Sequence, residues 1–214
     1  GENSMSLFPA IESFLTVQGS KYISPDKAGE LRETMLDLKA RGQAARQEFA
    51  NLVRDFQALY PKLSLERTSN WLNQAQILRP HFWNYLRGYG DITEPMFALR
   101  LYGTAEDFGV SLEVSFMERK KDEHSLSKQN RVLNLPIQPP AYYFAQIDGV
   151  SQRFDATEEN RQHLSQQVAT GLVRKVLIKY DVNLSEATSK QQVLSELEQA
   201  MTALIPFYEA TRFE

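Results

Sequence analysis

Tyrosine side chains gather around the predicted turns and strand ends of this sequence. Tyr85, Tyr89 and Tyr102 surround one turn-rich segment, and Tyr142 and Tyr143 stand together later in the chain. A nucleobase that is rotated out of a duplex needs aromatic walls for stacking and polar groups along its edge, and a tyrosine supplies both. The same rings could instead fill a hydrophobic core. Tyr89 stands between two glycines, where burial is difficult, so it is the first candidate for ligand contact.

Basic residues gather in segment 118–131, and its positive members are Arg119, Lys120, Lys121, Lys128 and Arg131. Three acidic residues dilute the segment, so five positive and three negative charges leave a balance of +2. A basic loop can position a duplex through its phosphates without reading the base sequence. The segment could equally be an ordinary solvated loop. We therefore take these five cations as candidate phosphate contacts.

Carboxylates suited to holding a metal ion lie in the same part of the chain. Asp107 and Glu113 precede Glu118-Arg119-Lys120, and an acidic residue followed by Glu-x-Lys at a strand end resembles the PD-(D/E)xK nucleases. That resemblance implies a divalent cation that activates water and a lysine that steadies the developing charge. Asp107, however, has no preceding proline and falls in a predicted hairpin turn. A nuclease is therefore an alternative, and the favoured interpretation needs neither a metal nor a cofactor.

The usual catalytic and nucleotide-binding motifs are absent from the sequence. It holds no P-loop, GxGxxG, GxSxG or HExxH motif and no cysteine. His81, His124 and His163 lack the spacing of metal ligands. The formal net charge of −3 counts against a large phosphate-coating surface but allows a small basic patch.

The composition is that of a folded globular protein, with 42% hydrophobic and 24% charged residues. No apolar run approaches the roughly 20 residues that span a bilayer, and no signal peptide is recognisable. The lack of cysteine fits a reducing compartment, so we expect a cytoplasmic protein. Gly1–Ser4 resembles the remnant of an expression tag, and we expect the native sequence to begin at Met5.

Helical periodicity dominates the first part of the chain, which we assign as a helical region over residues 5–87. Apolar residues recur at steps of three and four between Phe49 and Tyr60, which places them on one face of a helix that Pro61 ends. A second helical stretch is expected through Trp71, Leu72, Ala75 and Leu78. The adjacent Phe82 and Trp83 are expected to fill the core.

Alternation with a period of two begins in the middle of the chain. Residues 96–102 and 110–116 each place apolar and polar side chains on opposite sides, which predicts an antiparallel hairpin with one buried face. Further strands are expected at Tyr142–Ile147 and Val176–Tyr180, although the second could instead end a helix.

Two residues in the last part of the chain have the pattern of helix N-caps. Thr157 precedes two glutamates, and Ser189 opens a Ser-x-x-Gln capping box. The segment Lys120–Pro140 is expected to be a long loop. The sequence thus predicts an α+β fold, in which the helical region precedes a small, mostly antiparallel, curved sheet flanked by helices. Residues 88–214 would form that second unit, or be continuous with the first.

Over about residues 80–210 the chain resembles the N-terminal recognition domain of McrB-type, methylation-dependent restriction proteins. The segments that carry the resemblance are Gly88–Ala98, Val110–Phe116, Tyr142–Gln146, Leu197–Met201 and Phe207–Glu209. In that family a Tyr-Gly turn leads into strands of a curved sheet, paired tyrosines follow, and a final helix precedes a motor domain.

The resemblance implies binding of double-stranded DNA, modified or unmodified, with a modified cytosine rotated into an aromatic pocket. A motor or nuclease in another domain or subunit would then act on the DNA. Tyr89 matches the turn tyrosine near the DNA, and Tyr143 or Tyr142 matches a pocket tyrosine. Met96 stands where the family has tryptophan, which removes a stacking wall and leaves the modified base unspecified.

The favoured hypothesis is therefore a DNA-recognition module of a restriction or defence protein. Its expected contacts are Tyr89, Tyr142 and Tyr143 together with the five cations of segment 118–131. A second hypothesis is a protein-interaction domain without nucleic-acid binding, whose helical region would expose an apolar stripe along residues 49–60. Neither hypothesis involves a membrane.

Overall fold

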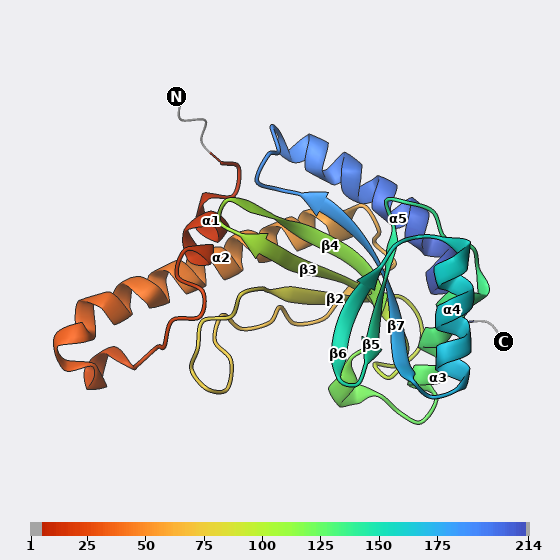
Figure 1. Ribbon diagram of the computed structural model, residues 1–214. Helices are drawn as coiled ribbons and strands as arrows, with labels where there is room; N and C mark the ends of the chain where they lie inside the picture. Colours follow the sequence, from red (N-terminus) through yellow and green to blue (C-terminus); the bar gives the residue numbers. More distant parts are fainter. Residues whose placement is uncertain (1–5, 213–214) are drawn as a thin grey trace.

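The computed structural model describes residues 6–212, and within them seven strands form one antiparallel sheet (Figure 1). The strands are β1 (Ser64–Leu65), β2 (Trp83–Arg87), β3 (Met96–Thr104), β4 (Asp107–Ser115), β5 (Tyr142–Ile147), β6 (Val150–Phe154) and β7 (Val173–Asn183). The helices are α1 (Pro9–Leu15), α2 (Arg32–Ala58), α3 (Ser125–Gln129), α4 (Glu158–Ala169) and α5 (Lys190–Arg212). The fold is α+β, with helices first and then a sheet flanked by helices, as the sequence predicts. The tag remnant expected at Gly1–Ser4, and Met5, lie outside the described residues.

The sheet has the strand order β1-β2-β3-β4-β7-β5-β6. Helices α2 and α5 run behind it, α1 packs against α2, and α4 packs against β7 (Figure 1). One continuous hydrophobic core lies between these helices and the sheet. None of the helices within residues 6–212 is both long and apolar enough to cross a bilayer.

The apolar stripe of α2 belongs to this core. Phe49, Leu52, Val53 and Phe56 are all buried, and Phe49 stacks on Phe82 with 5.8 Å between the ring centroids. The stripe is therefore buried from Phe49 to Phe56, and only Leu59, which is 44% exposed, and the half-buried Tyr60 reach the surface at its end. The continuous exposed stripe along residues 49–60 that the second hypothesis expected is absent from the described structure. The periodicity predicted the helix correctly, but the sheet provides the partner for its apolar face.

The second helical stretch, expected through Trp71 and Leu78, does not form. The chain is irregular there, with isolated bridges that join Leu72 to Leu78 and Lys21 to Ile77. The Asn73 side chain accepts a hydrogen bond from the Ile77 amide at 3.0 Å, which replaces the helical pattern with a turn. The expected helical region also contains β2, which pairs with β3 across residues 83–86.

The expected antiparallel hairpin forms from β3 and β4, with Leu99 opposite Leu112 and Leu101 opposite Val110. Its polar face differs from the prediction, because Ser111, Glu113 and Ser115 are buried as well. The expectation of one buried face is therefore wrong for β4. This strand is central, and side chains from β3 and β7 close over its polar residues.

The predicted helix starts and later strands are confirmed. Thr157 accepts a hydrogen bond from the Asn160 amide at 3.0 Å, and Ser189 accepts one from the Gln192 amide at 3.0 Å. In a capping box the Gln192 side chain would accept a hydrogen bond from the Ser189 amide. Here it accepts from the amide and the hydroxyl of Thr188 instead. Residues 176–180 lie within β7 and so form a strand, not a helix end.

The expected loop over residues 120–140 contains short helical elements. Helix α3 is followed by a 3₁₀ turn at Asn130–Asn134, and the two place polar side chains between β4 and β7 where these strands separate. Gln129 is fully buried and donates to the carbonyls of Val114 and Val176 at 2.9 and 3.0 Å. The side-chain amide of Gln129 therefore links β4 and β7 at the point where their backbone pairing ends.

Gly88, where we expected a boundary between residues 5–87 and 88–214, lies between two paired strands of this sheet. The Tyr208 hydroxyl of α5 accepts a hydrogen bond from the Tyr89 amide at 3.0 Å. A Cβ atom at Gly88 would come within 2.1 Å of that hydroxyl oxygen. The first and last parts of the chain are thus packed together at the β2–β3 turn.

Substitution of Gly88 tests this close contact. We expect Gly88→Ala to lower the free energy of unfolding by about 1–3 kcal/mol, because the new methyl group overpacks against Tyr208. In a Tyr208→Phe background the same substitution should cost less, since the closest atom is gone. Urea unfolding of the four proteins measures the coupling, and strictly additive effects would contradict the contact.

Candidate functional site

The face of the sheet opposite α2 and α5 carries charged and aromatic side chains. Residues in register on neighbouring antiparallel strands share a face, so the pairing identifies them. Two adjacent rows cross the sheet: Tyr85, Ala98, Glu113, Lys179 and Tyr142 in one, and Trp83, Arg100, Ser111 and Asp181 in the other.

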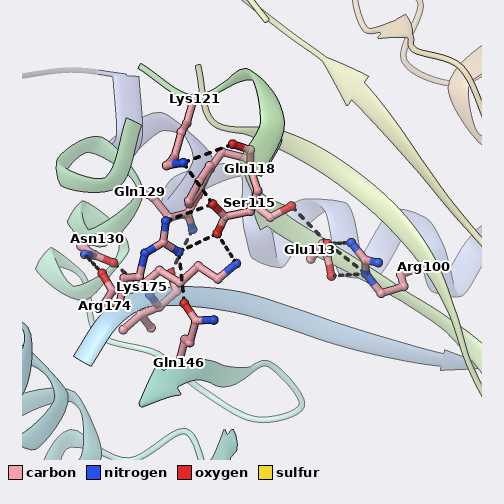
Figure 2. A network of polar contacts seen from close by, with 12 residues as sticks. Arg100, Glu113, Ser115, Glu118, Lys121, Gln129, Asn130, Gln146, Arg174 and Lys175 are labelled. Carbon is pink, nitrogen blue, oxygen red and sulfur yellow. Dashed lines mark hydrogen bonds and ion pairs between the residues drawn. The ribbon is translucent and has the colours of Figure 1, made fainter. Parts of the chain in front are cut away.

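A buried ion-pair network occupies the centre of this face (Figure 2). The Glu113 carboxylate is 0% exposed and lies 3.1 Å from Nη2 of Arg100 and 3.1 Å from Nζ of Lys179. The Ser115 hydroxyl donates a further hydrogen bond to it. Burial raises the pKa of Glu113, but Arg100 and Lys179 outweigh burial and hold the pKa at about 2. Two cations therefore share one carboxylate, which leaves one positive charge in excess.

His81 lies beside this network and is expected to be neutral. Its ring centroid is 5.6 Å from that of Trp83. Burial lowers the pKa of His81 to about 4, and the positive charges of Arg100 and Lys179 act in the same direction. The histidine therefore contributes no charge to this face near neutral pH.

An open groove of about 520 Å³ runs along β2 and β3 on the same face. This volume falls within the roughly 300–1,000 Å³ of typical ligand sites. Its lining residues are Glu66, Arg67, Trp83, Tyr85, Ile92, Arg100, Met117, Glu118, Arg119 and Lys120. The groove thus combines two aromatic rings and two other apolar side chains with four cations.

The two acidic residues of the groove are held by cations that do not line it. Glu66 pairs with Arg87 at 3.0 Å. Glu118 accepts from Arg174 at 2.6 and 3.0 Å and from Lys175 at 2.7 Å, as Figure 2 shows. The hydrogen bonds from Arg174 above all, together with those from Lys175, lower the pKa of Glu118 to about 2. Both carboxylates are therefore already neutralised.

Four cations in and beside the groove form no ion pair with any residue of the described range: Arg67, Arg79, Arg119 and Lys120. The Arg79 guanidinium lies 4.6 Å from the centroid of the Trp83 ring, and its buried Nε has no hydrogen-bond acceptor. Burial lowers the pKa of Arg79, and repulsion from Arg119 lowers it further. Arg79 and Arg119 therefore repel each other, and neither is paired with a carboxylate among residues 6–212.

The basic segment expected to contact phosphates is divided by the fold. Arg119 and Lys120 line the groove. Lys121 is exposed and lies 3.8 Å from Glu118, whereas Lys128 pairs with Glu94 at 2.7 Å. Arg131 is half-buried in the 3₁₀ turn that follows α3. The structure therefore brings only the first two of the five candidates to the groove.

The three candidate tyrosines lie in three different surroundings. Tyr143 faces the helices, is 0% exposed and cannot reach a ligand from there, so its assignment to a pocket is wrong. Tyr142 faces the open side and donates a hydrogen bond to Asp181 at 2.6 Å, with the Arg153 guanidinium over its ring. Tyr89 is 55% exposed, but its ring lies 3.3 Å from the Arg212 guanidinium, away from the groove lining.

The carboxylates of the nuclease hypothesis are not brought together. Asp107 is exposed at the start of β4 and accepts from Asn183, whereas Glu113 is buried in the middle of the strand and Glu118 lies beyond its end. At roughly 3.3 Å per residue, Asp107 and Glu113 are about 20 Å apart along an extended strand. No group of three or more histidine, aspartate or glutamate residues in positions 6–212 could hold a metal ion.

Several residues in and beside the groove were missed as site residues by sequence reasoning. Trp83 was expected in the core, and Arg67, Arg79 and Arg100 were not considered. One signal was available for Tyr142 and Tyr143, because neighbouring residues of a strand point to opposite faces and only one could reach the open side. No local pattern marks Arg67 and Arg79, since both lie in an irregular segment.

No protein-family model matches this sequence, and no similar chain is found among curated proteins.

The neutral state of His81 predicts acid-sensitive stability. The imidazole pKa is about 4 in the folded protein and about 6.5 when unfolded, so the unfolded chain binds more protons between these values. We therefore expect the free energy of unfolding to fall by about 1–3 kcal/mol as the pH drops through this interval. The contribution of Glu113 is lost in a lower window, below pH of about 4.5.

Urea unfolding at pH values from about 4 to about 7 measures this dependence. His81→Gln should flatten the curve, whereas His163→Gln on the exposed side of α4 should leave it unchanged. Equal pH dependence in the wild type and His81→Gln would contradict a neutral, buried His81.

The adjacent tyrosines provide a matched test of the two faces. The buried Tyr143 hydroxyl has no partner, so Tyr143→Phe should keep the free energy of unfolding or raise it by up to about 1 kcal/mol. Tyr142→Phe should lower it by about 1–2 kcal/mol, because the bond to Asp181 is lost. Denaturant unfolding gives both values, and a reversed order would show that the faces are assigned incorrectly.

Proposed function

We propose that this chain is a DNA-binding recognition module of a restriction or defence protein, and that it reads modified bases by accepting a base rotated out of the duplex. The observation that carries the proposal is the groove beside β2, where unpaired cations adjoin Trp83 and Tyr85. The proposal assigns recognition to this chain and leaves translocation or cleavage of DNA to another domain or subunit.

The charges of the groove are suited to a phosphate backbone. Arg119 and Lys120 are exposed in the 3₁₀ turn Glu118–Lys120, and the exposed Arg67 lines the same groove. Each phosphate neutralised by such a group releases counterions, which supplies affinity that falls with rising salt. Guanidinium groups also bind phosphate oxygens in a bidentate manner. This set of three is small, as expected for a protein with a net charge of −3.

The aromatic side chains of the groove are suited to an unstacked base. Stacking of a base on an aromatic ring contributes about 1–3 kcal/mol, as measured by alanine substitution. Trp83 and Tyr85 are both half-buried on the open face and line the groove beside the cations. In our proposal they take the role that the sequence suggested for Tyr89 and Tyr143.

Fluorescence anisotropy with matched duplexes tests the proposal. The duplexes carry unmodified, 5-methyl or 5-hydroxymethyl cytosine, and each is titrated at two salt concentrations. We expect tighter binding to a modified duplex and a salt dependence of about −0.9 per phosphate contact. Arg119→Ala/Lys120→Ala should weaken binding by about 10- to 100-fold and reduce the magnitude of the slope by about 2.

Lys39→Ala is the control, because Lys39 is exposed on α2 and does not line the groove. This variant should bind as the wild type does. Absence of binding to every duplex at low salt would end the proposal. An equal loss of affinity in Lys39→Ala and in the double variant would show that the groove is not the binding site.

A further inference from the structure

We propose that the part of the groove lined by Arg100 and Arg119, with Arg79 beside it at the Trp83 ring, is an anion-binding subsite for an acidic group attached to a planar ring. The inference rests on the proposed function in using the same groove, but it concerns a small ligand and does not require a duplex. A phosphate on a nucleotide and a carboxylate on a base share the chemistry in question.

The charge balance of the buried network is the first reason for an anion. Glu113 is the only carboxylate paired with either Arg100 or Lys179 within residues 6–212. The Lys179 side chain is 9% exposed, whereas that of Arg100 is 25% exposed and lines the groove. The uncompensated positive charge is therefore accessible from the groove through Arg100.

The second reason is an unsatisfied hydrogen-bond donor. The Nε of Arg79 is buried without an acceptor, and a buried donor left unpaired is costly. Repulsion from Arg119 lowers the pKa of Arg79, so the two cations do not stabilise each other. An anion near both would satisfy the donor and relieve the repulsion between the guanidinium groups.

The rest of the lining specifies what the anion is attached to. Trp83, Tyr85, Ile92 and Met117 present apolar surface, and the acidic residues Glu66 and Glu118 are paired with other cations. A cavity of about 520 Å³ accommodates a ligand much larger than a free anion. The ligand that fits these features is a flat, conjugated ring bearing one acidic substituent, and inorganic phosphate alone lacks the part that contacts the apolar walls.

Calorimetric titration of the whole chain with four small molecules tests the inference. The molecules are cytidine, cytidine 5′-monophosphate, 5-carboxycytidine and inorganic phosphate. We expect at least one of the two ring-bearing anions to bind about tenfold or more tightly than both cytidine and phosphate. A preference for the monophosphate identifies a phosphate subsite, and a preference for 5-carboxycytidine identifies a carboxylate on the base.

Two variants and a control localise the site. Arg119→Ala alters an exposed side chain outside the core and should weaken anion binding at least about fivefold, as should Arg79→Gln. Lys39→Ala should have no effect. Quenching of Trp83 fluorescence by the anion, absent in Trp83→Phe, gives an independent signal, since the other tryptophan, Trp71, is 7% exposed in the core.

The outcomes separate this inference from the proposed function. Equal affinity for cytidine and both ring-bearing anions, or binding that Arg119→Ala and Arg79→Gln leave unchanged, would overturn the subsite. If the chain binds modified duplexes but none of the small anions, the inference fails while the proposed function stands. If it binds a ring-bearing anion but no duplex, the subsite stands and the DNA-binding proposal fails.

Discussion

The buried carboxylate of Glu113 constrains the structure more than any other single group, because it must keep two cations beside it. Removing an ion from water costs several kcal/mol, and an unpaired buried charge typically destabilises a protein by about 3–5 kcal/mol. Arg100 comes from β3 and Lys179 from β7, on either side of β4. The network therefore fixes the relative positions of three central strands and of the groove floor that Arg100 forms.

A second network extends this constraint to the rim of the groove (Figure 2). Glu118 follows β4 and is held by Arg174 and Lys175 of β7, beyond the point where the backbones of the two strands stop pairing. Gln129 fills the gap between the strands there. Glu118 is the first residue of the turn that carries Arg119 and Lys120. Its ion pairs with β7 therefore hold that turn, and with it the two cations, in place.

Elements with a local cause could be predicted from the sequence, whereas most of the groove, apart from Arg119 and Lys120, could not. The β3–β4 hairpin and the caps at Thr157 and Ser189 depend on alternation or on neighbours within a few residues. Trp83 lies in a five-residue strand that is defined by its pairing with β3. Arg67 and Arg79 are positioned by an irregular segment without periodicity. The sequence offered Tyr142 and Tyr143 together, because register in the sheet decides which of two adjacent tyrosines faces outward.

A net charge of −3 is compatible with a basic groove because charge is balanced locally. The two carboxylates that line the groove and the one that holds Arg100 are all paired: Glu66 with Arg87, Glu118 with Arg174 and Lys175, and Glu113 with Arg100 and Lys179. Exposed acids elsewhere are screened over about 10 Å at 0.1 M salt. An anion approaching the groove therefore encounters mainly the cations that these pairs leave over, and the overall charge acts chiefly on its approach from a distance.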